Sequence, residues 1–239
     1  MTAISEEARM PYAALQALKN LVRRWIPVGR LSWAQEGEDL VLARLLGPMT
    51  RPGFFVDIGA HHPTRYSNTY YFYRRGWRGI NVDPLPGSAA LFRRQRPRDI
   101  SLECGVAAQV GVLTYHAFND PALNTFSPEE AARKNVAPYR LLGTSQAPVH
   151  TLAGILERHL PPGQFIDFLS IDAEGLDHDI VASNDWETYR PRWVLVELLQ
   201  TDFAGVAAHP TAQLLQQAGY APCAKTLNTV FFQDQRTAA

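Results

Sequence analysis

The segment Phe54-Phe55-Val56-Asp57-Ile58-Gly59-Ala60-His61-His62-Pro63 decides how this chain is expected to fold. Its apolar half ends in Asp-x-Gly-Ala, as a buried parallel strand does where it opens into a ligand-binding turn. About 20 residues further on, a second apolar run, residues 79–82, ends in Asp83. This is the spacing of a nucleotide-binding fold, in which the acid at the tip of the second strand binds a ribose diol.

The turn after the first strand indicates which cofactor is expected. It holds one glycine, Gly59, where the dinucleotide fingerprint has three. A pyrophosphate needs close approach of the backbone at several positions, whereas S-adenosylmethionine carries no phosphate and tolerates Ala60 and His61 there. The turn therefore favours a methyl donor over NAD, with Asp57 and the backbone of Gly59 facing the methionine end of the donor.

The composition is that of one globular domain of the larger α/β kind. The chain has 239 residues, of which 46% are hydrophobic and 19% charged, and both values are ordinary. The 23 Lys and Arg residues balance 23 Asp and Glu residues, so no net field favours nucleic acid or an anionic membrane. There are two cysteines, no secretory h-region with a cleavage site, and no apolar run near the roughly 18 residues of a membrane span. We therefore expect a cytoplasmic protein with reduced thiols.

The first 31 residues are expected to form a separate N-terminal helical extension. From Ala8 to Leu31, apolar residues recur at steps of three and four, with Arg and Lys between them. Such an amphipathic helix with a basic face would dock onto the domain or onto a second copy of the chain, giving a homo-oligomer. A membrane-surface or polysaccharide role is the alternative. The cofactor-binding domain would then comprise residues 32–239.

Strand and helix patterns alternate through that domain. They predict an α/β fold with a mostly parallel seven-stranded sheet, helices on both of its faces and a hairpin-like C-terminal pair. The expected strands are 54–58, 79–82, 100–104, 165–172, 193–198, 221–225 and 229–233, and the expected helices are 40–46, 67–75, 89–95, 151–159, 177–183 and 211–218.

Two stretches stand outside this alternation. The alternating stretch 111–118 is expected to be a hairpin strand beside the third strand of the sheet. From Asn119 to Val149 no period is sustained. We interpret this segment as loop and short helix that walls or covers the acceptor site, because a loop of this length in a compact domain is usually functional.

Acidic residues follow several of the predicted strands. Asp57, Asp83 and Asp172 each stand where a parallel strand ends, and Glu197 is a fourth candidate. Ligands of open α/β sheets lie outside the carboxyl ends of the strands, so we expect these acids to converge. A single acid at such a place could be a plain helix cap. Three at successive tips favour a binding site.

Six segments of the chain form a combined pattern whose spacing is specific, although each motif alone is weak. They are Gln35-Glu36-Gly37-Glu38-Asp39, Val56-Asp57-Ile58-Gly59-Ala60-His61-His62-Pro63, Ser67-Asn68-Thr69, Gly76-Trp77-Arg78-Gly79-Ile80-Asn81-Val82-Asp83-Pro84, Asn124-Thr125-Phe126 and Ser170-Ile171-Asp172-Ala173-Glu174-Gly175. With these segments the chain resembles the FkbM family of S-adenosylmethionine-dependent O-methyltransferases, from about Ser32 to Phe232.

The resemblance implies a Rossmann-like class I methyltransferase fold and methyl transfer to a hydroxyl, commonly that of a sugar. Family members also methylate polyketide hydroxyls and other acceptors, so the acceptor does not follow from the match. Within the resemblance, Ser67 and Asn68 would approach the amino-acid end of the cofactor, and Val106 the adenine.

Methyl transfer to an alcohol requires in-line approach, a desolvated pocket and a proton acceptor. Asp172, His61 and His62 are the candidate bases, with Glu197 nearby. The alternative role for one of the two adjacent histidines is to orient the turn. Alternatively, Asp172 and Glu197 would hold Mg²⁺, which acidifies the hydroxyl. Two other groups of charges are interpreted as solvated helix ends: Asp177-His178-Asp179 at a start, and Arg93, Arg94, Arg96 and Arg98 at an end.

The sequence therefore predicts an O-methyltransferase that acts on a hydroxyl of a saccharide or glycosylated metabolite. Its partners would be a small-molecule or glycan acceptor, with no nucleic acid. Two alternatives remain open: methyl transfer to a non-sugar hydroxyl or an amine, and a non-catalytic scaffold that keeps the cofactor fold. Intact acids at the strand tips count against the scaffold.

Overall fold

The computed structural model describes residues 13, 16, 21 and 29–236. The chain divides into two units, residues 1–31 and 32–239. Ala13, Gln16 and Leu21 are helical. The rest of the predicted N-terminal amphipathic helix lies outside the described residues, so its basic face and its docking stay predictions.

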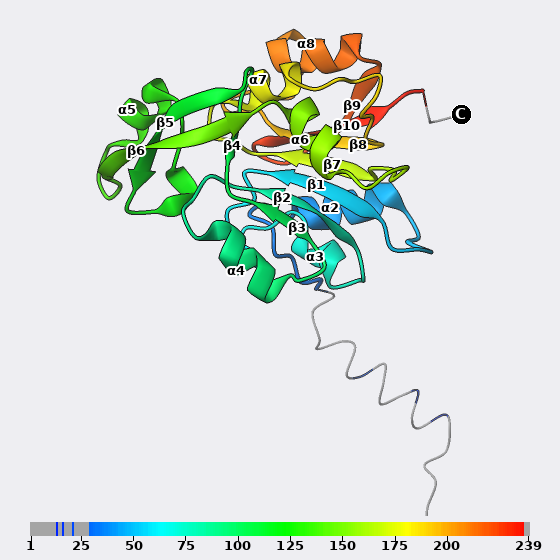
Figure 1. The fold of residues 1–239 in the computed structure, drawn as a ribbon. Coiled ribbons are helices and arrows are strands. Elements are labelled where there is room, and N and C mark those ends of the chain that lie inside the picture. The colour runs from blue at the N-terminus through cyan, green and yellow to red at the C-terminus, as the bar shows by residue number, and fades with distance from the viewer. Residues whose placement is uncertain (1–12, 14–15, 17–20, 22–28, 237–239) are drawn as a thin grey trace, which may run out of the picture. The chain divides into compact units, whose positions relative to one another are not determined.

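Residues 32–236 are built on a seven-stranded sheet (Figure 1). Its first five strands in space are mutually parallel, whereas β10 runs antiparallel to both of its neighbours. This confirms the predicted mostly parallel sheet with a C-terminal hairpin. In spatial order the strands are β3 (Ile100–Leu102), β2 (Arg78–Val82), β1 (Phe54–Ile58), β7 (Phe168–Ile171), β8 (Trp193–Glu197), β10 (Thr229–Asp234) and β9 (Tyr220–Lys225).

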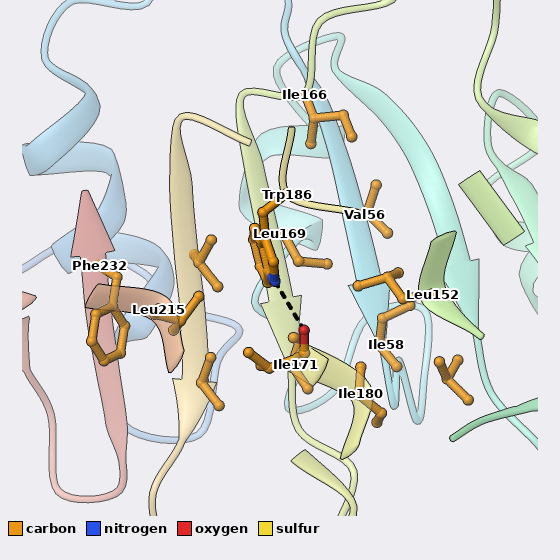
Figure 2. Packing of buried hydrophobic residues seen from close by; sticks show 14 of the residues in the cluster. Val56, Ile58, Leu152, Ile166, Leu169, Ile171, Ile180, Trp186, Leu215 and Phe232 are labelled. Atoms are coloured by element: carbon orange, nitrogen blue, oxygen red, sulfur yellow. Dashed lines mark hydrogen bonds between the residues drawn. The ribbon is translucent and has the colours of Figure 1, made fainter. Parts of the chain in front are cut away.

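One face of the sheet is covered by α6 (Leu152–His159), α7 (Asp177–Ala182) and α8 (Pro210–Gln217). Alternate residues of the central strands point to this side, because successive side chains of a strand face opposite ways. Figure 2 shows Val56 and Ile58 of β1 beside Leu169 and Ile171 of β7 in this core. The indole Nε1 of Trp186 donates to the Val181 carbonyl at 3.0 Å, so the large ring is buried without leaving its polar atom unpaired.

The opposite face packs against α2 (Glu38–Leu46) and α3 (Tyr70–Tyr73). Here Phe55 and Phe168 of neighbouring strands stack at 5.7 Å between ring centroids, and Phe72 of α3 lies 4.9 Å from Phe168. Two further elements complete this part of the chain, α4 (Ser88–Gln95) and the 3₁₀ turn η2 (Val206–Ala208). Helices on both faces confirm the expected layering.

A second, three-stranded sheet departs from the expectation. It consists of β4 (Gly105–Val106), β6 (Leu141–His150) and β5 (Gly111–Phe118) in that order, with η1 (Pro121–Leu123) and α5 (Pro128–Lys134) between β5 and β6. The strand at 111–118 exists but pairs with β6, not with β3. Figure 1 shows β5 and β6 lying to one side of the main sheet.

The interpretation of residues 119–149 as loop and short helix was therefore wrong for residues 141–149, which belong to β6. Residues 141–146 of β6 are exposed, so this strand shows no apolar–polar alternation that a pattern search could detect. Gly143 and Pro148 weaken the strand signal further. The strand exists because it lies between β4 and β5 and pairs with both.

No helix within the described residues is both long enough and apolar enough to cross a membrane.

Candidate active site

A cavity of about 610 Å³ lies where β1, β2, β7 and β8 end, at the side of the second sheet. Gly59, Asp83, Asp172 and Glu197 line it, each at or just after the last residue of one of these strands. The connection from β5 to β6 supplies a second wall, including residues 120–126, 133, 134, 136, 137 and 139. The carboxyl ends of the parallel strands and the segment between β5 and β6 thus enclose one site.

Only glycine fits the turn after β1. Gly59 has φ 77°, and a Cβ at this position would lie 1.7 Å from the Asp172 carbonyl oxygen. The amide groups of Gly59 and Ala60 both donate to the Val82 carbonyl, at 3.0 and 3.1 Å. The turn therefore locks the ends of β1, β2 and β7 together. Gly59 lines the cavity, whereas Ala60 is buried and is not among the lining residues.

Asp83 is held rigidly at the tip of β2. Its Oδ2 accepts from the His61 amide at 2.7 Å and its Oδ1 from the Leu85 amide at 2.8 Å. Burial raises the pKa of this carboxyl, and the two amide hydrogen bonds oppose that rise. Each oxygen has a further lone pair, so the carboxylate can still accept from a diol in the cavity. Val106, which is buried, lines the cavity near the end of β4.

The two adjacent histidines have different surroundings. His61 lines the cavity with φ 50°, and its ring stacks on Tyr66 at 6.2 Å between centroids. Burial and the neighbouring His62 lower the pKa of His61, so its imidazole is neutral near pH 7. His62 is not among the lining residues; its Nδ1 accepts from the amides of Thr64 and Arg65 at 3.1 and 3.2 Å. His62 thus orients the turn.

Of three further residues predicted to contact the cofactor, one lines the cavity and two are buried behind its wall. Asn68 lines the cavity, and its Nδ2 donates to Ser170 Oγ at 3.0 Å. Ser67 and Asp57 are buried behind the wall and are not among the lining residues. The Asp57 carboxylate accepts from Thr69 Oγ1 at 2.8 Å, and burial raises the pKa of Asp57 to about 6. The structure therefore gives Asp57 and Ser67 partners within the protein.

Carboxyl groups are crowded at the tips of β7 and β8. Burial, and next the charge of Glu197, raise the pKa of Asp172 well above its ordinary value. Burial, Glu174 and Asp177 raise the pKa of Glu197 to about 8. The Oε2 atom of Glu197 is buried without a hydrogen-bond partner in the described part of the chain. Two carboxyl groups in such surroundings share protons rather than both ionising, because desolvation and mutual repulsion disfavour the doubly charged state.

We find no group of three or more His, Cys, Asp or Glu side chains placed to hold a metal ion among the residues that the structure describes. Asp172 and Glu197, predicted as tentative metal ligands, therefore stand as a pair without a third ligand from these residue types.

The loop after β7 is fixed from two sides. Asp177 accepts from the Ala173 and Gly175 amides at 3.0 and 3.2 Å. It is 8% exposed, so the prediction of a solvated helix start was wrong for Asp177. Lys134 of α5 contacts the Glu174 carboxylate at 2.5 Å, and the Thr125 hydroxyl donates to the Glu174 carbonyl at 2.7 Å. The inserted segment is thus bonded to the loop that carries Asp172.

Several lining residues were not predicted from the sequence as site residues. Glu36 and Glu38 lie in a segment that had been noted only for its family resemblance; Glu36 accepts from the Asn228 amide at 3.0 Å and thereby holds the turn before β10. Tyr115 lines the cavity with a pKa raised by burial, and its hydroxyl bonds to Asn124. Lys134 was not singled out, because the short helix expected within 119–149 had been given no position.

A parallel α/β sheet with an antiparallel final strand, an acid after its second strand and a cavity at the strand tips defines the Rossmann-like methyltransferase class. The cavity residues suit the cofactor of that class, because Asp83 presents a fixed carboxylate and Gly59 allows close backbone approach. The family model named "Methyltransferase FkbM domain" matches residues 57–222. The chain belongs to the FkbM family of S-adenosylmethionine-dependent methyltransferases.

Comparison with solved structures finds methyltransferases of low sequence identity. One is the 1,6-didemethyltoxoflavin-N1-methyltransferase of Burkholderia thailandensis with bound S-adenosylhomocysteine, at 15% identity and TM-score 0.42, covering 96% of this chain and 91% of that one. Another is an O-methyltransferase of Bacillus cereus, at 11% identity and TM-score 0.37, covering 94% and 91%. A TehB-like methyltransferase of Corynebacterium glutamicum has 10% identity and TM-score 0.37, covering 93% and 97%. Comparison with curated proteins finds no match.

Proposed function

We propose that this methyltransferase transfers a methyl group from S-adenosylmethionine to a hydroxyl of a saccharide or glycosylated metabolite. The observation that carries the proposal is a single cavity that follows the tips of four neighbouring strands. Asp83 lines it after β2 and Glu197 at the end of β8, with Gly59 and Asp172 between them. Such an arrangement suits a nucleoside at one end and a hydroxylated acceptor at the other.

The cofactor end would be formed by four of the predicted residues. Asp83 would accept hydrogen bonds from the ribose hydroxyls, the Gly59 turn and Asn68 would face the amino-acid end, and Val106 would face the adenine. When bound there, S-adenosylmethionine supplies an electrophilic methyl group. Asp57 and Ser67 would act on the cofactor indirectly, by fixing the segment between Gly59 and Asn68.

The proton of the acceptor hydroxyl would go to Asp172. Its raised pKa makes it a stronger base than an ordinary carboxylate, and a base is most effective when its pKa approaches the working pH. Burial raises the pKa of both Asp172 and Glu197, so the pair would carry one negative charge near pH 7 and could take up the proton. His61, neutral and in the cavity, is the second candidate. A bound Mg²⁺ held by Asp172 and Glu197 is the alternative that acidifies the hydroxyl instead.

The acceptor end suits a neutral polyhydroxylated molecule. Glu36, Glu38, Asp172 and Glu197 line the cavity, and within the described residues none has a Lys, Arg or His nitrogen within 4.0 Å. Arg133 and Lys134 also line the cavity, but each is paired with a carboxylate, Glu130 or Glu174. The four carboxyl groups can accept hydrogen bonds from hydroxyl groups and would repel phosphate or carboxylate groups on an acceptor. Tyr139 also lines the cavity and is 42% exposed, which suits stacking against the apolar face of a sugar ring.

The proposal includes a cytoplasmic location, an acceptor that is not nucleic acid, and self-association through residues 1–31. The equal numbers of acidic and basic residues support the absence of a nucleic-acid partner. Methyl transfer to a non-sugar hydroxyl or an amine is the rival enzyme activity, and a scaffold without catalysis is the rival from another class.

Two measurements on the purified protein, made one after the other, test the proposal. Calorimetry with S-adenosylhomocysteine asks whether the cofactor end binds; no binding would favour the scaffold. Release of S-adenosylhomocysteine from S-adenosylmethionine is then measured with neutral methyl glycosides, with non-sugar alcohols and with amines. Turnover with glycosides alone is the expected result, and turnover confined to alcohols or amines would contradict the saccharide assignment.

A further inference from the structure

We propose that Arg96 is a positioning residue, which sets the affinity for the cofactor by fixing the segment Gly59–Thr69 through the Thr69 hydroxyl. The inference rests on the proposed cofactor end of the cavity. It assigns a role to an arginine that the sequence pattern had placed at a solvated helix end. Arg93 and Arg94 are indeed exposed, but Arg96 has no exposed surface.

The guanidinium of Arg96 is enclosed by aromatic rings and one carboxylate. Its central carbon lies 5.2, 5.0 and 5.4 Å from the ring centroids of Phe55, Tyr73 and Phe92. Its Nε donates to Asp99 Oδ2 at 2.7 Å, and both side chains of this ion pair are fully buried. A buried charge is tolerated when it is paired and hydrogen-bonded, and aromatic faces add cation–π attraction.

The remaining hydrogen bonds of Arg96 go to the cofactor segment. Its Nη1 donates to Thr69 Oγ1 at 2.9 Å, to the Pro63 carbonyl at 3.3 Å and to Ser67 Oγ at 3.5 Å. These acceptors flank Tyr66 and Asn68, both of which line the cavity. The arginine thus holds the segment from behind while its neighbours face the ligand.

Thr69 extends the connection to β1. Its hydroxyl accepts from Arg96 and donates its own proton to Asp57 Oδ2 at 2.8 Å, and Asp57 stands two residues before Gly59. On the other side, Asp99 accepts from the Gly79 amide and from Asn81 Nδ2, each at 3.0 Å, and both belong to β2, whose tip carries Asp83.

One continuous network therefore connects β2, the segment 59–69 and β1. Arginine is required because its planar guanidinium group bonds Asp99 through Nε and the segment 59–69 through Nη1. The lysine side chain has a single nitrogen and cannot reach both. Loss of the Thr69 hydroxyl would leave both Asp57 and Arg96 short of a partner.

The test compares four variants by calorimetry with S-adenosylhomocysteine, after circular dichroism has shown each to be folded. Thr69→Val removes the hydroxyl but keeps the shape, Thr69→Ser restores the hydroxyl, and Arg96→Lys keeps the charge but not the guanidinium group. Thr211→Val is the matched control, because Thr211 is a buried threonine of α8 whose hydroxyl contacts His178. A purely structural role would lower the melting temperature without this pattern of affinities.

We expect Thr69→Val and Arg96→Lys to weaken binding by about tenfold or more. Thr69→Ser should bind within about threefold of wild type, and Thr211→Val should be unchanged. Folded Thr69→Val or Arg96→Lys protein that binds as tightly as wild type would overturn the inference, as would equal losses in Thr69→Val and Thr211→Val. A wild-type protein that does not bind at all would instead refute the proposed function.

Discussion

Asp83 accepts two backbone hydrogen bonds with the carboxylate that is proposed to bind the ribose. The residue therefore fixes its own orientation before any ligand arrives. Asp83→Ala should weaken S-adenosylhomocysteine binding by about 2–4 kcal/mol, the value of two charge-assisted hydrogen bonds. Asp83→Asn, which can still accept from one amide, should lose less. Calorimetry on folded variants checks this, and unchanged affinity in Asp83→Ala would show that the cofactor binds elsewhere.

The chemistry can be probed at Asp172. Asp172→Asn keeps the side-chain shape and removes the charge, so we expect kcat to fall by roughly 10²–10⁴-fold with cofactor affinity little altered. Steady-state kinetics with an accepted glycoside measure both quantities. A fully active variant would leave Asp172 without a part in the reaction.

Removal of metal ions with EDTA distinguishes a mechanism that uses bound Mg²⁺ from direct proton removal by a side chain. Loss of activity in EDTA, with recovery on addition of Mg²⁺, would favour an ion bound by Asp172 and Glu197. Activity that is indifferent to EDTA would favour direct proton removal. In that case a His61→Gln variant tells whether His61, which lines the cavity, shares the task.

Glu197 makes a prediction about stability. Its pKa is raised from 4.5 to about 8 in the folded protein, so the folded state favours the protonated form. This contribution to stability is fully present below the unfolded pKa and is lost as the pH rises through about 8. The melting temperature of Glu197→Gln relative to wild type should therefore rise between pH 5 and pH 9. Glu157→Gln, an exposed helical control, should show no such trend.

Single residues show where sequence reasoning succeeds and fails. The glycine of the turn and the acids Asp83 and Asp172 were predictable, because strand ends and their spacing are local patterns. The burial of Arg96 was not, because Arg96 contacts Thr69 in a distant part of the chain. Asp177 accepts from the nearby Ala173 and Gly175 amides, but an acid in the first turn of a helix gives no sign of being buried. Asp57 and Ser67 were placed at the correct end of the sheet, but their contacts within the protein depend on side-chain directions that no spacing reveals.

At the scale of elements, the inserted segment is expected to respond to ligands unevenly. Strands β5 and β6 are paired over eight residues of β5, so their amides should exchange slowly with or without ligands. Helix α5 and the connection 135–140 line the cavity with few backbone bonds to the main sheet. Their amides should become protected when cofactor and acceptor are both bound, as measured by hydrogen exchange with mass spectrometry. Equal protection in the free and bound protein would contradict a closing wall.

The main elements followed from periodicity. The five parallel strands and the helices that cover them carry enough apolar residues on their buried faces for the sequence pattern to predict them. The second sheet was not predicted, because its strands are exposed over much of their length. In addition, the pairing of β6 with β4 and β5 joins residues far apart in sequence. Local patterns carry little information about such pairings.

For the whole molecule, the lining residues of the cavity within the described part of the chain all fall between Gln35 and Thr229. A chain that starts at Ser32 should therefore bind S-adenosylhomocysteine with the affinity of the full chain. If residues 1–31 mediate self-association, the same truncation should lower the mass measured by light scattering. A loss of cofactor affinity on truncation would show that the extension contributes to the site.

The short parallel pairing of β4 with β6 has a consequence for how such enzymes diversify. Gly105 lies opposite Val149, and Val106 opposite His150, so the chain leaves the main fold and returns to it at neighbouring points. The residues between these points add no strand to the main sheet. We expect that exchanging residues 107–148 between relatives would change the proposed acceptor wall and leave the proposed cofactor residues Gly59 and Asp83 in place.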